Sequence, residues 1–147
     1  MSESSFAAAS GQATSCDVLI VGAGPAGSAC AQLLARDGFD VVLADSQVFP
    51  RDKVCGDGLI PDAHAALARL GVLDQVMARA QRARHVGCIG PRGGRVDVPG
   101  ALAVLPRREL DHILCKAAVE AGAKPLMPAR FEAPIEQDGC VVGARLK

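Results

Sequence analysis

A glycine-rich turn between two apolar runs constrains this sequence more than any other feature. The first run, "CDVLIVG" (16–22), is short, rich in β-branched residues and closed by glycine, as in a buried parallel strand. The segment "PAGSACAQLLARDG" (25–38) has the composition of a helix. The second run, "FDVVLAD" (39–45), predicts another buried strand. Strand, helix and strand within about 30 residues predict a βαβ unit with a right-handed crossover.

The turn "VGAGPAG" carries Gly22, Gly24 and Gly27 in the G-x-G-x-x-G pattern. In a dinucleotide-binding loop, Gly22 makes the tight turn, Gly24 lets the backbone approach a pyrophosphate, and Gly27 lets the helix pack closely on the strand. Pro25 and Ala26 then open the helix, whose free N–H groups and positive dipole end favour phosphate. The pattern therefore predicts a phosphate-binding loop.

An acid stands where a ribose contact is expected. Asp45 follows Gly27 by 18 residues, at the end of the second strand, where a carboxylate accepts hydrogen bonds from the ribose hydroxyls. A carboxylate there disfavours a 2′-phosphate, so NADP is not expected at this site. These features leave FAD and NAD open, and a glycine-rich turn without a ligand is the alternative.

The rest of the chain predicts a truncated α/β domain: a Rossmann-like parallel core with a small β-excursion. A long loop without periodicity follows the second strand, and loops of this length are commonly functional. A strongly amphipathic helix lies further along. The expected elements are a loop at 46–60, helices at 61–71, 72–80 and 107–122, short strands within 84–105, a third parallel strand at 123–129, and a C-terminal hairpin turned at Asp138–Gly139.

Composition excludes several classes of function. Net charge is zero, so neither nucleic acid nor an acidic membrane surface is an expected partner. Arg79, Arg82 and Arg84 are interpreted as a solvated helix end. Six cysteines without CxxC spacing argue against a metal site and favour a cytoplasmic chain with reduced thiols. Residues 1–15 are expected to form a disordered leader, and 16–147 the domain. No signal peptide or transmembrane segment is evident.

Three segments give the chain a family resemblance: "DVLIVGAGPAGSACAQLLARDGFDVVLAD", "FPRDKVCGDGL" and "LPRRELDHILCKAAVEAGA". From them it resembles the group-2 FAD oxidoreductases with the para-hydroxybenzoate hydroxylase type of fold, and within these the geranylgeranyl reductase family. The third segment matches the R-x-x-L/F-D helix start of the superfamily. The resemblance implies FAD as cofactor and Arg107 as a residue that approaches it.

The resemblance also gives the long loop a role. It implies that the loop runs along the flavin side of FAD, with Arg51 and Lys53 contacting the phosphates or the ribityl chain. It places Cys55 and Gly56 beside the isoalloxazine ring. Cys55 is the tentative catalytic residue, with Lys53 expected to lower its pKa, and an inert cysteine in a turning loop is the alternative.

Three functions follow as hypotheses. The first is a FAD-dependent reductase that delivers hydride from reduced flavin to an isoprenoid double bond. The second is a flavin monooxygenase that uses NAD(P)H and oxygen on an aromatic substrate. The third is a non-catalytic nucleotide-binding fragment or subunit. Because family members are much longer, the chain is expected to be an N-terminal portion that lacks the C-terminal half with its substrate domain.

Overall fold

The computed structural model describes residues 15–147, so the expected leader lies almost wholly outside the described residues. Strand β1 (Val18–Val21), helix α1 (Pro25–Arg36) and strand β2 (Val41–Ala44) form the predicted βαβ unit. The two strands are parallel, and Val18 is opposite Val41. Strand β6 (Lys124–Leu126) pairs in parallel with the other edge of β2, which gives the order β1-β2-β6. The predicted α/β class and the third parallel strand are confirmed.

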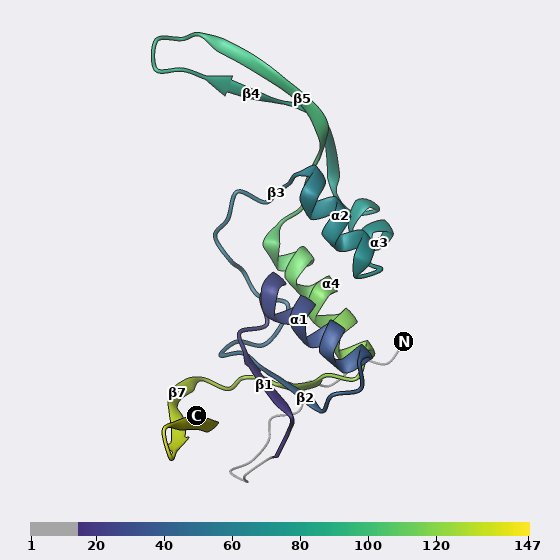
Figure 1. Ribbon diagram of the computed structural model, residues 1–147. Helices are drawn as coiled ribbons and strands as arrows, with labels where there is room; N and C mark the ends of the chain where they lie inside the picture. The colour runs from purple at the N-terminus through teal and green to yellow at the C-terminus, as the bar shows by residue number, and fades with distance from the viewer. Residues whose placement is uncertain (1–14) are drawn as a thin grey trace.

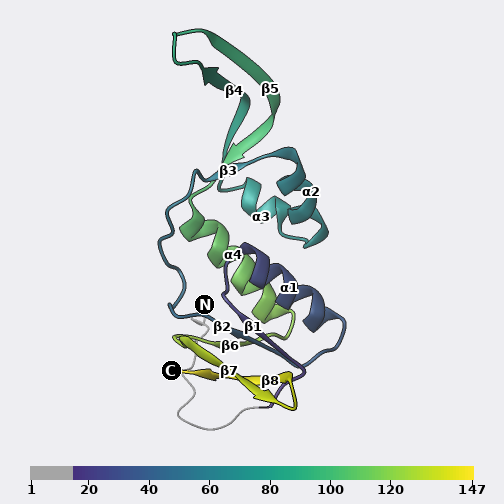
Figure 2. The same cartoon turned by 60° about the vertical axis from the view of Figure 1, so that its left-hand side comes forward.

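Helices α1 and α4 (Arg107–Glu120) lie side by side on one face of this sheet (Figures 1 and 2). Apolar side chains from both helices and from β2 fill the space between the two layers. Val41 and Leu43 on β2 are fully buried, as are Ala31 on α1 and Ala118 on α4. Because all four residues of β2 are buried, a continuous apolar run was the correct signal for this central strand.

A second apolar cluster lies on the other side of α4. Helices α2 (Pro61–Arg69) and α3 (Leu73–Met77) contribute buried side chains to it, and α4 contributes Ile113 and Leu114. The predicted amphipathic helix therefore has two buried sides, one toward the sheet and one toward α2 and α3.

The predicted β-excursion is a long hairpin of β4 (Gln81–Ile89) and β5 (Arg95–Val104), with β3 (Gly58–Leu59) paired to the base of β5. It projects from the helical body (Figure 1). The structure corrects the expected helix at 72–80, because α3 ends at Met77 and β4 begins at Gln81. Arg82 and Arg84 consequently lie on a strand and do not form a helix end.

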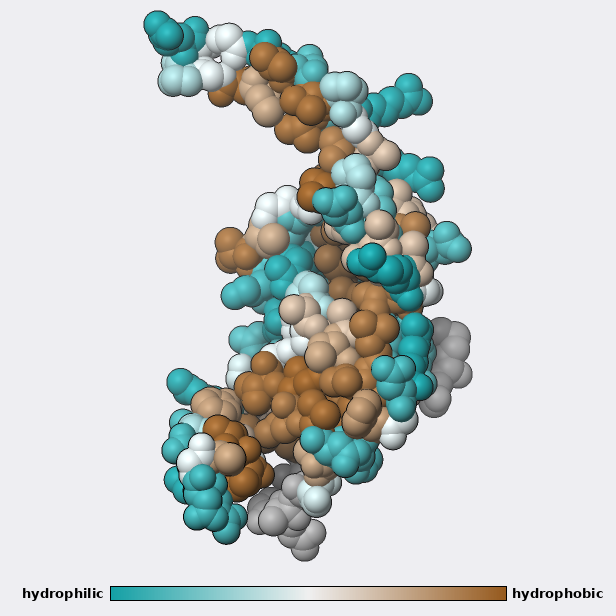
Figure 3. Space-filling model, in the orientation of Figure 1, coloured by the Kyte–Doolittle hydropathy of each residue, from teal (hydrophilic) through white to brown (hydrophobic). Residues whose placement is uncertain are grey.

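Apolar surface runs along this hairpin and across the part of the body that holds β1 and β2 (Figure 3). Val86 is opposite Val98 on the hairpin, and each is about half exposed. Among the described strands, β1 pairs only with β2, so its other edge carries no partner strand.

The chain ends in a hairpin of β7 (Phe131–Gln137) and β8 (Cys140–Leu146), at the opposite end of the molecule from β4–β5 (Figure 1). Asp138 and Gly139 both have positive φ, at 52° and 76°, as a two-residue turn of this kind requires. The predicted turn is therefore confirmed. None of the helices within residues 15–147 has the length and apolar character needed to cross a membrane.

Candidate cofactor-binding site

The loop between β1 and α1 has the geometry that its glycines predict. Gly22 has φ 102°, in the region that favours glycine, and its N–H donates to the carbonyl of Ala44 on β2. A Cβ on Gly27 would lie 1.8 Å from the Gly22 carbonyl oxygen, so helix and strand approach too closely for any side chain there. A Cβ on Gly24 would meet nothing closer than 3.7 Å. Gly24 is the N-cap of α1, and Pro25 is its first residue.

Asp45 is hydrogen-bonded to the loop between β1 and α1. It follows β2, is largely buried, and accepts the backbone N–H of Ala23 at 2.8 Å and that of Gln47 at 2.9 Å. An ionised carboxylate offers about four acceptor positions, so two remain for a ligand hydroxyl. Asp45 therefore also holds the phosphate loop against β2, a role that its position in the sequence did not indicate.

Two arginines face Gly24 from different parts of the chain. An ideal Cβ on Gly24 would lie 3.7 Å from Nη2 of Arg107 and 3.8 Å from Nη2 of Arg51. Arg51 comes from the long loop, and its guanidinium lies 4.7 Å from the centre of the Phe49 ring. Arg107 is the first residue of α4. Two positive charges and a helix N-terminus thus converge on the glycine that was predicted to face a pyrophosphate.

One buried acid joins these arginines. Asp111, fully buried on α4, receives hydrogen bonds from Nε of Arg107 at 2.6 Å and from Nη2 of Arg107 at 3.0 Å. Nη1 of Arg51 lies 3.2 Å from Oδ2 of Asp111. Hydrogen bonding to Asp111 raises the pKa of Arg107, which stays cationic. Asp111 lies in the second turn of α4, and Glu109 is the acid of the first turn.

The long loop is tied to the start of α4 by Asp57. Asp57 has a left-handed φ of 55°, which Asp tolerates better than most residues. Its Oδ1 accepts the backbone N–H of Arg107 at 3.1 Å, and its carbonyl accepts the N–H of Leu105 at 3.0 Å. The Asp57 carboxylate thus accepts a backbone N–H at the start of α4 that has no partner within the helix, although Asp57 is far from Arg107 in the sequence.

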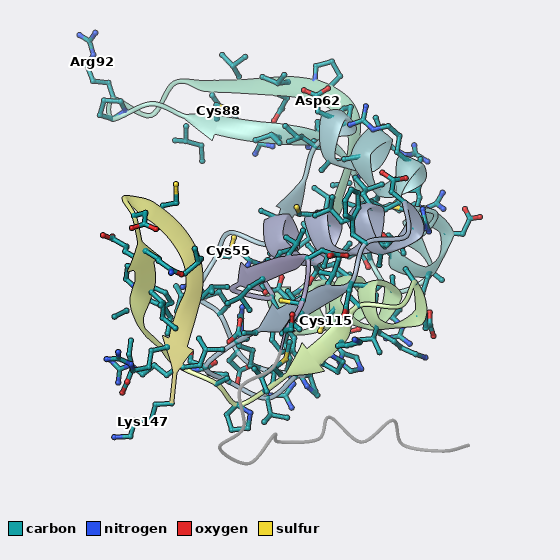
Figure 4. All side chains as sticks on the ribbon, turned by 60° about the horizontal axis from the view of Figure 1, so that its bottom comes forward. Cys55, Asp62, Cys88, Arg92, Cys115 and Lys147 are labelled. Carbon is teal, nitrogen blue, oxygen red and sulfur yellow. The ribbon has the colours of Figure 1, made fainter. Side chains whose placement is uncertain are left out.

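Cys55 lies at the surface of the loop, whereas Cys115 lies inside the body (Figure 4). The backbone N–H of Asp57, and after it the Arg107 guanidinium, lower the pKa of the Cys55 thiol. Lys53, the residue expected to do this, is not among the causes. All six cysteines lie within the described residues and are free thiols.

The predicted site residues fall into two groups. The first group surrounds the N-terminus of α1: Gly22, Gly24, Pro25, Ala26, Gly27, Asp45, Arg51 and Arg107. The second lies on the exposed stretch of the loop: Lys53, Cys55 and Gly56. Sequence reasoning missed the two linking roles of Asp57 and Asp111. Only the i,i+4 spacing of Arg107 and Asp111 hinted at the second. Together these features define a dinucleotide-binding α/β domain.

Comparison with known proteins assigns the family. Residues 15–147 match the model described as an FAD binding domain, so the chain belongs to this family of FAD-binding flavoprotein oxidoreductases. The predicted cofactor, FAD, is thereby confirmed.

Three known proteins illustrate the likeness. The menaquinone reductase of Mycolicibacterium smegmatis is 40% identical over 88% of this chain and 36% of its own length. The digeranylgeranylglycerophospholipid reductase 2 of Methanopyrus kandleri is 36% identical over 86% of this chain and 32% of its own. The solved structure of the flavin-dependent brominase Bmp2 has a TM-score of 0.81 and 28% identity, over 90% of this chain and 34% of that one. The chain spans about a third of the length of the relatives it matches.

The residues present fit FAD on structural grounds. Gly24 leaves open the position at which a side chain would contact both arginines, and Nη1 of Arg51 is buried without a well-oriented hydrogen-bond acceptor. The arginines and the helix N-terminus suit a pyrophosphate, and the remaining acceptor positions of Asp45 suit a ribose. When bound, FAD supplies hydride-transfer chemistry, and the protein supplies binding and orientation.

Proposed function

We propose that this chain is the FAD-binding part of a reductase that saturates an isoprenoid double bond with hydride from reduced flavin. The observation that carries the proposal is the 40% identity to a menaquinone reductase across 88% of the chain, including the whole of the candidate site. A second relative is named for a digeranylgeranyl lipid, so two relatives act on molecules with isoprenoid chains.

In this proposal each group of site residues has one task. Gly22, Gly24 and Gly27 shape the loop that receives the pyrophosphate, and Asp45 accepts hydrogen bonds from the ribose. Arg51 and Arg107 neutralise the phosphate charge, because their guanidiniums already face Gly24.

Cys55 lies beside the flavin in this proposal. Its exposure leaves room for the ring, and the Asp57 backbone N–H and the Arg107 guanidinium lower the pKa of its thiol. Lys53 and Gly56, on the same exposed stretch of loop, line the edge of this region.

The first test is cofactor binding by the chain itself. The visible spectrum of the purified chain is recorded with and without added FAD. The expected result is a protein-perturbed flavin spectrum that needs a higher FAD concentration to appear in Gly24→Ala. A wild-type spectrum that is the simple sum of free FAD and protein would contradict the proposed site.

The second test is the reaction. Residues 15–147 replace the matching segment of the Mycolicibacterium smegmatis menaquinone reductase, and the same chimera with Gly24→Ala is the control. The expected product is menaquinone that has gained two hydrogens in its side chain, as fragmentation mass spectrometry locates them. A chimera that binds flavin, oxidises NAD(P)H and reduces oxygen without changing menaquinone would point to the monooxygenase alternative.

A further inference from the structure

Asp111 is the one fully buried carboxylate among the described residues, and both of its close charged partners belong to the candidate FAD site. A buried carboxylate without partners is strongly unfavourable, so its place in the fold depends on the groups that face it.

The Asp111 carboxylate contacts both arginines. Arg107 meets it side-on through Nε at 2.6 Å and Nη2 at 3.0 Å, the forked geometry that fixes a guanidinium plane. Arg51 approaches Oδ2 through Nη1 at 3.2 Å. Arg51 belongs to the long loop, whereas Arg107 and Asp111 lie in the first and second turns of α4. One carboxylate therefore contacts two guanidiniums that are far apart in the sequence.

Both guanidiniums also approach the phosphate loop, and Nη2 of Arg107 keeps a second N–H beside the one that it donates to Asp111. Their Nη2 atoms lie 3.7 Å and 3.8 Å from the position of a Cβ on Gly24, the N-cap of α1. Their side chains are 13% exposed for Arg51 and 18% for Arg107, so the packed surroundings also restrict them. Nη2 of Arg51 lies 3.9 Å from Oδ2 of Asp45, beyond hydrogen-bonding distance, so it retains donor capacity for a ligand.

We propose that Asp111 is a positioning residue of the cofactor site, which holds Arg51 and Arg107 in place for the pyrophosphate of FAD before the cofactor arrives. This inference rests on the proposed site. Two arginines fixed in advance lose less side-chain entropy on binding, so the affinity for a diphosphate rises. Asp111 itself makes no contact with the ligand in this arrangement.

The sign of the effect separates positioning from simple electrostatics. Removing a negative charge near a phosphate site should strengthen phosphate binding if charge alone matters. If Asp111 positions the arginines, the variant Asp111→Asn should bind more weakly in spite of its lost negative charge. Glu109→Gln is the matched control, because it removes an exposed acid from the same helix.

The experiment measures ADP and FAD affinity by calorimetry for wild type, Asp111→Asn and Glu109→Gln, with amide NMR spectra to verify that each variant is folded. We expect affinity to fall at least about tenfold for Asp111→Asn and to change less than about twofold for Glu109→Gln. Equal or tighter binding by folded Asp111→Asn would overturn the inference. A wild-type chain that binds neither ligand would refute the proposed site, and this inference with it.

A second measurement needs only the wild-type chain without ligand. Proton exchange at Nε–H of Arg107 is compared by NMR with that of Arg108, whose side chain is 54% exposed. The forked contact with buried Asp111 should slow exchange at Arg107 at least about tenfold, because the proton is both hydrogen-bonded and shielded from water. Equal exchange rates at the two arginines would overturn the inference even if FAD binds.

Discussion

Substitution of Gly27 by alanine should damage the fold, whereas the same substitution at Gly24 should damage only cofactor binding. At Gly27 the new Cβ would lie 1.8 Å from the Gly22 carbonyl oxygen and 3.3 Å from Cγ2 of Ile20. An ordinary carbon–oxygen contact is about 3.3 Å, so the oxygen contact is about 1.5 Å too short. The clashing atom belongs to the backbone, so no change of rotamer relieves it.

The expected loss in the free energy of unfolding is at the upper end of the range for substitutions that overpack a buried region. Added methyl groups in packed regions typically cost about 1–3 kcal/mol, and here α1 must move away from β1 to make room. We therefore expect Gly27→Ala to lower the free energy of unfolding by about 3 kcal/mol or more. For a domain of this size that corresponds to a melting temperature roughly 10 °C lower.

Gly24→Ala is the matched control for the fold. Its nearest neighbours would be the arginine Nη2 atoms at 3.7 Å and 3.8 Å, and its φ of −70° suits any residue. The free energy of unfolding should change by less than about 1 kcal/mol, the scale of a cap substitution. The added methyl group occupies the approach to the phosphate loop, so FAD affinity should fall by about tenfold or more.

Thermal unfolding by circular dichroism and flavin titration by fluorescence measure both effects on the same samples. The reasoning would be refuted if Gly27→Ala melted within about 2 °C of wild type. It would also be refuted if Gly24→Ala lost as much stability as Gly27→Ala, because the two glycines would then share one structural role.

Three further predictions use titratable groups of the site. Asp45→Asn should weaken FAD binding about tenfold by calorimetry and lower stability by about 1 kcal/mol, because the carboxylate also accepts the Ala23 N–H. Cys55 should react with iodoacetamide at lower pH than an ordinary thiol, because its pKa is lowered, and Arg107→Gln should move the rate profile to higher pH. Burial raises the pKa of Cys115 from 9.0 to about 12, so the unfolded state releases this proton first. Stability should therefore fall as pH rises above about 9, and less steeply in Cys115→Ala, as alkaline urea titrations would show.

The βαβ core was predictable because its information is local. The apolar runs that become β1 and β2 are continuous, the glycines stand at fixed offsets, and Asp45 directly follows the second strand. Each feature reports on its own segment, and together they also predicted where the phosphate loop would lie.

The boundary near residue 80 was less predictable because two patterns compete there. The segment that becomes α3 continues into alanine and arginine residues with good helical propensity, yet Gln81 to Ala83 pair with β5. Tertiary pairing overrides local propensity at this point, and it moves Arg82 and Arg84 onto a strand.

The contacts between the long loop and α4 could not be predicted from local sequence patterns. Asp57 accepts the N–H of Arg107, and Asp111 lies beside Arg51, so both contacts join residues far apart in the chain. The left-handed φ of Asp57 has only a weak signature in sequence, because Asp merely tolerates what glycine prefers. The geometry of the glycine-rich loop could thus be predicted, whereas the contacts of Asp57 and Asp111 required the structure.

A crystal structure of this chain with FAD would show directly whether the cofactor lies at the N-terminus of α1. We expect the pyrophosphate at Gly24 and the N-terminus of α1, within hydrogen-bonding distance of Arg51 and Arg107, with the ribose on Asp45 and the flavin toward Cys55. FAD bound with its pyrophosphate away from α1, or with the two arginines turned out to solvent, would contradict this expectation.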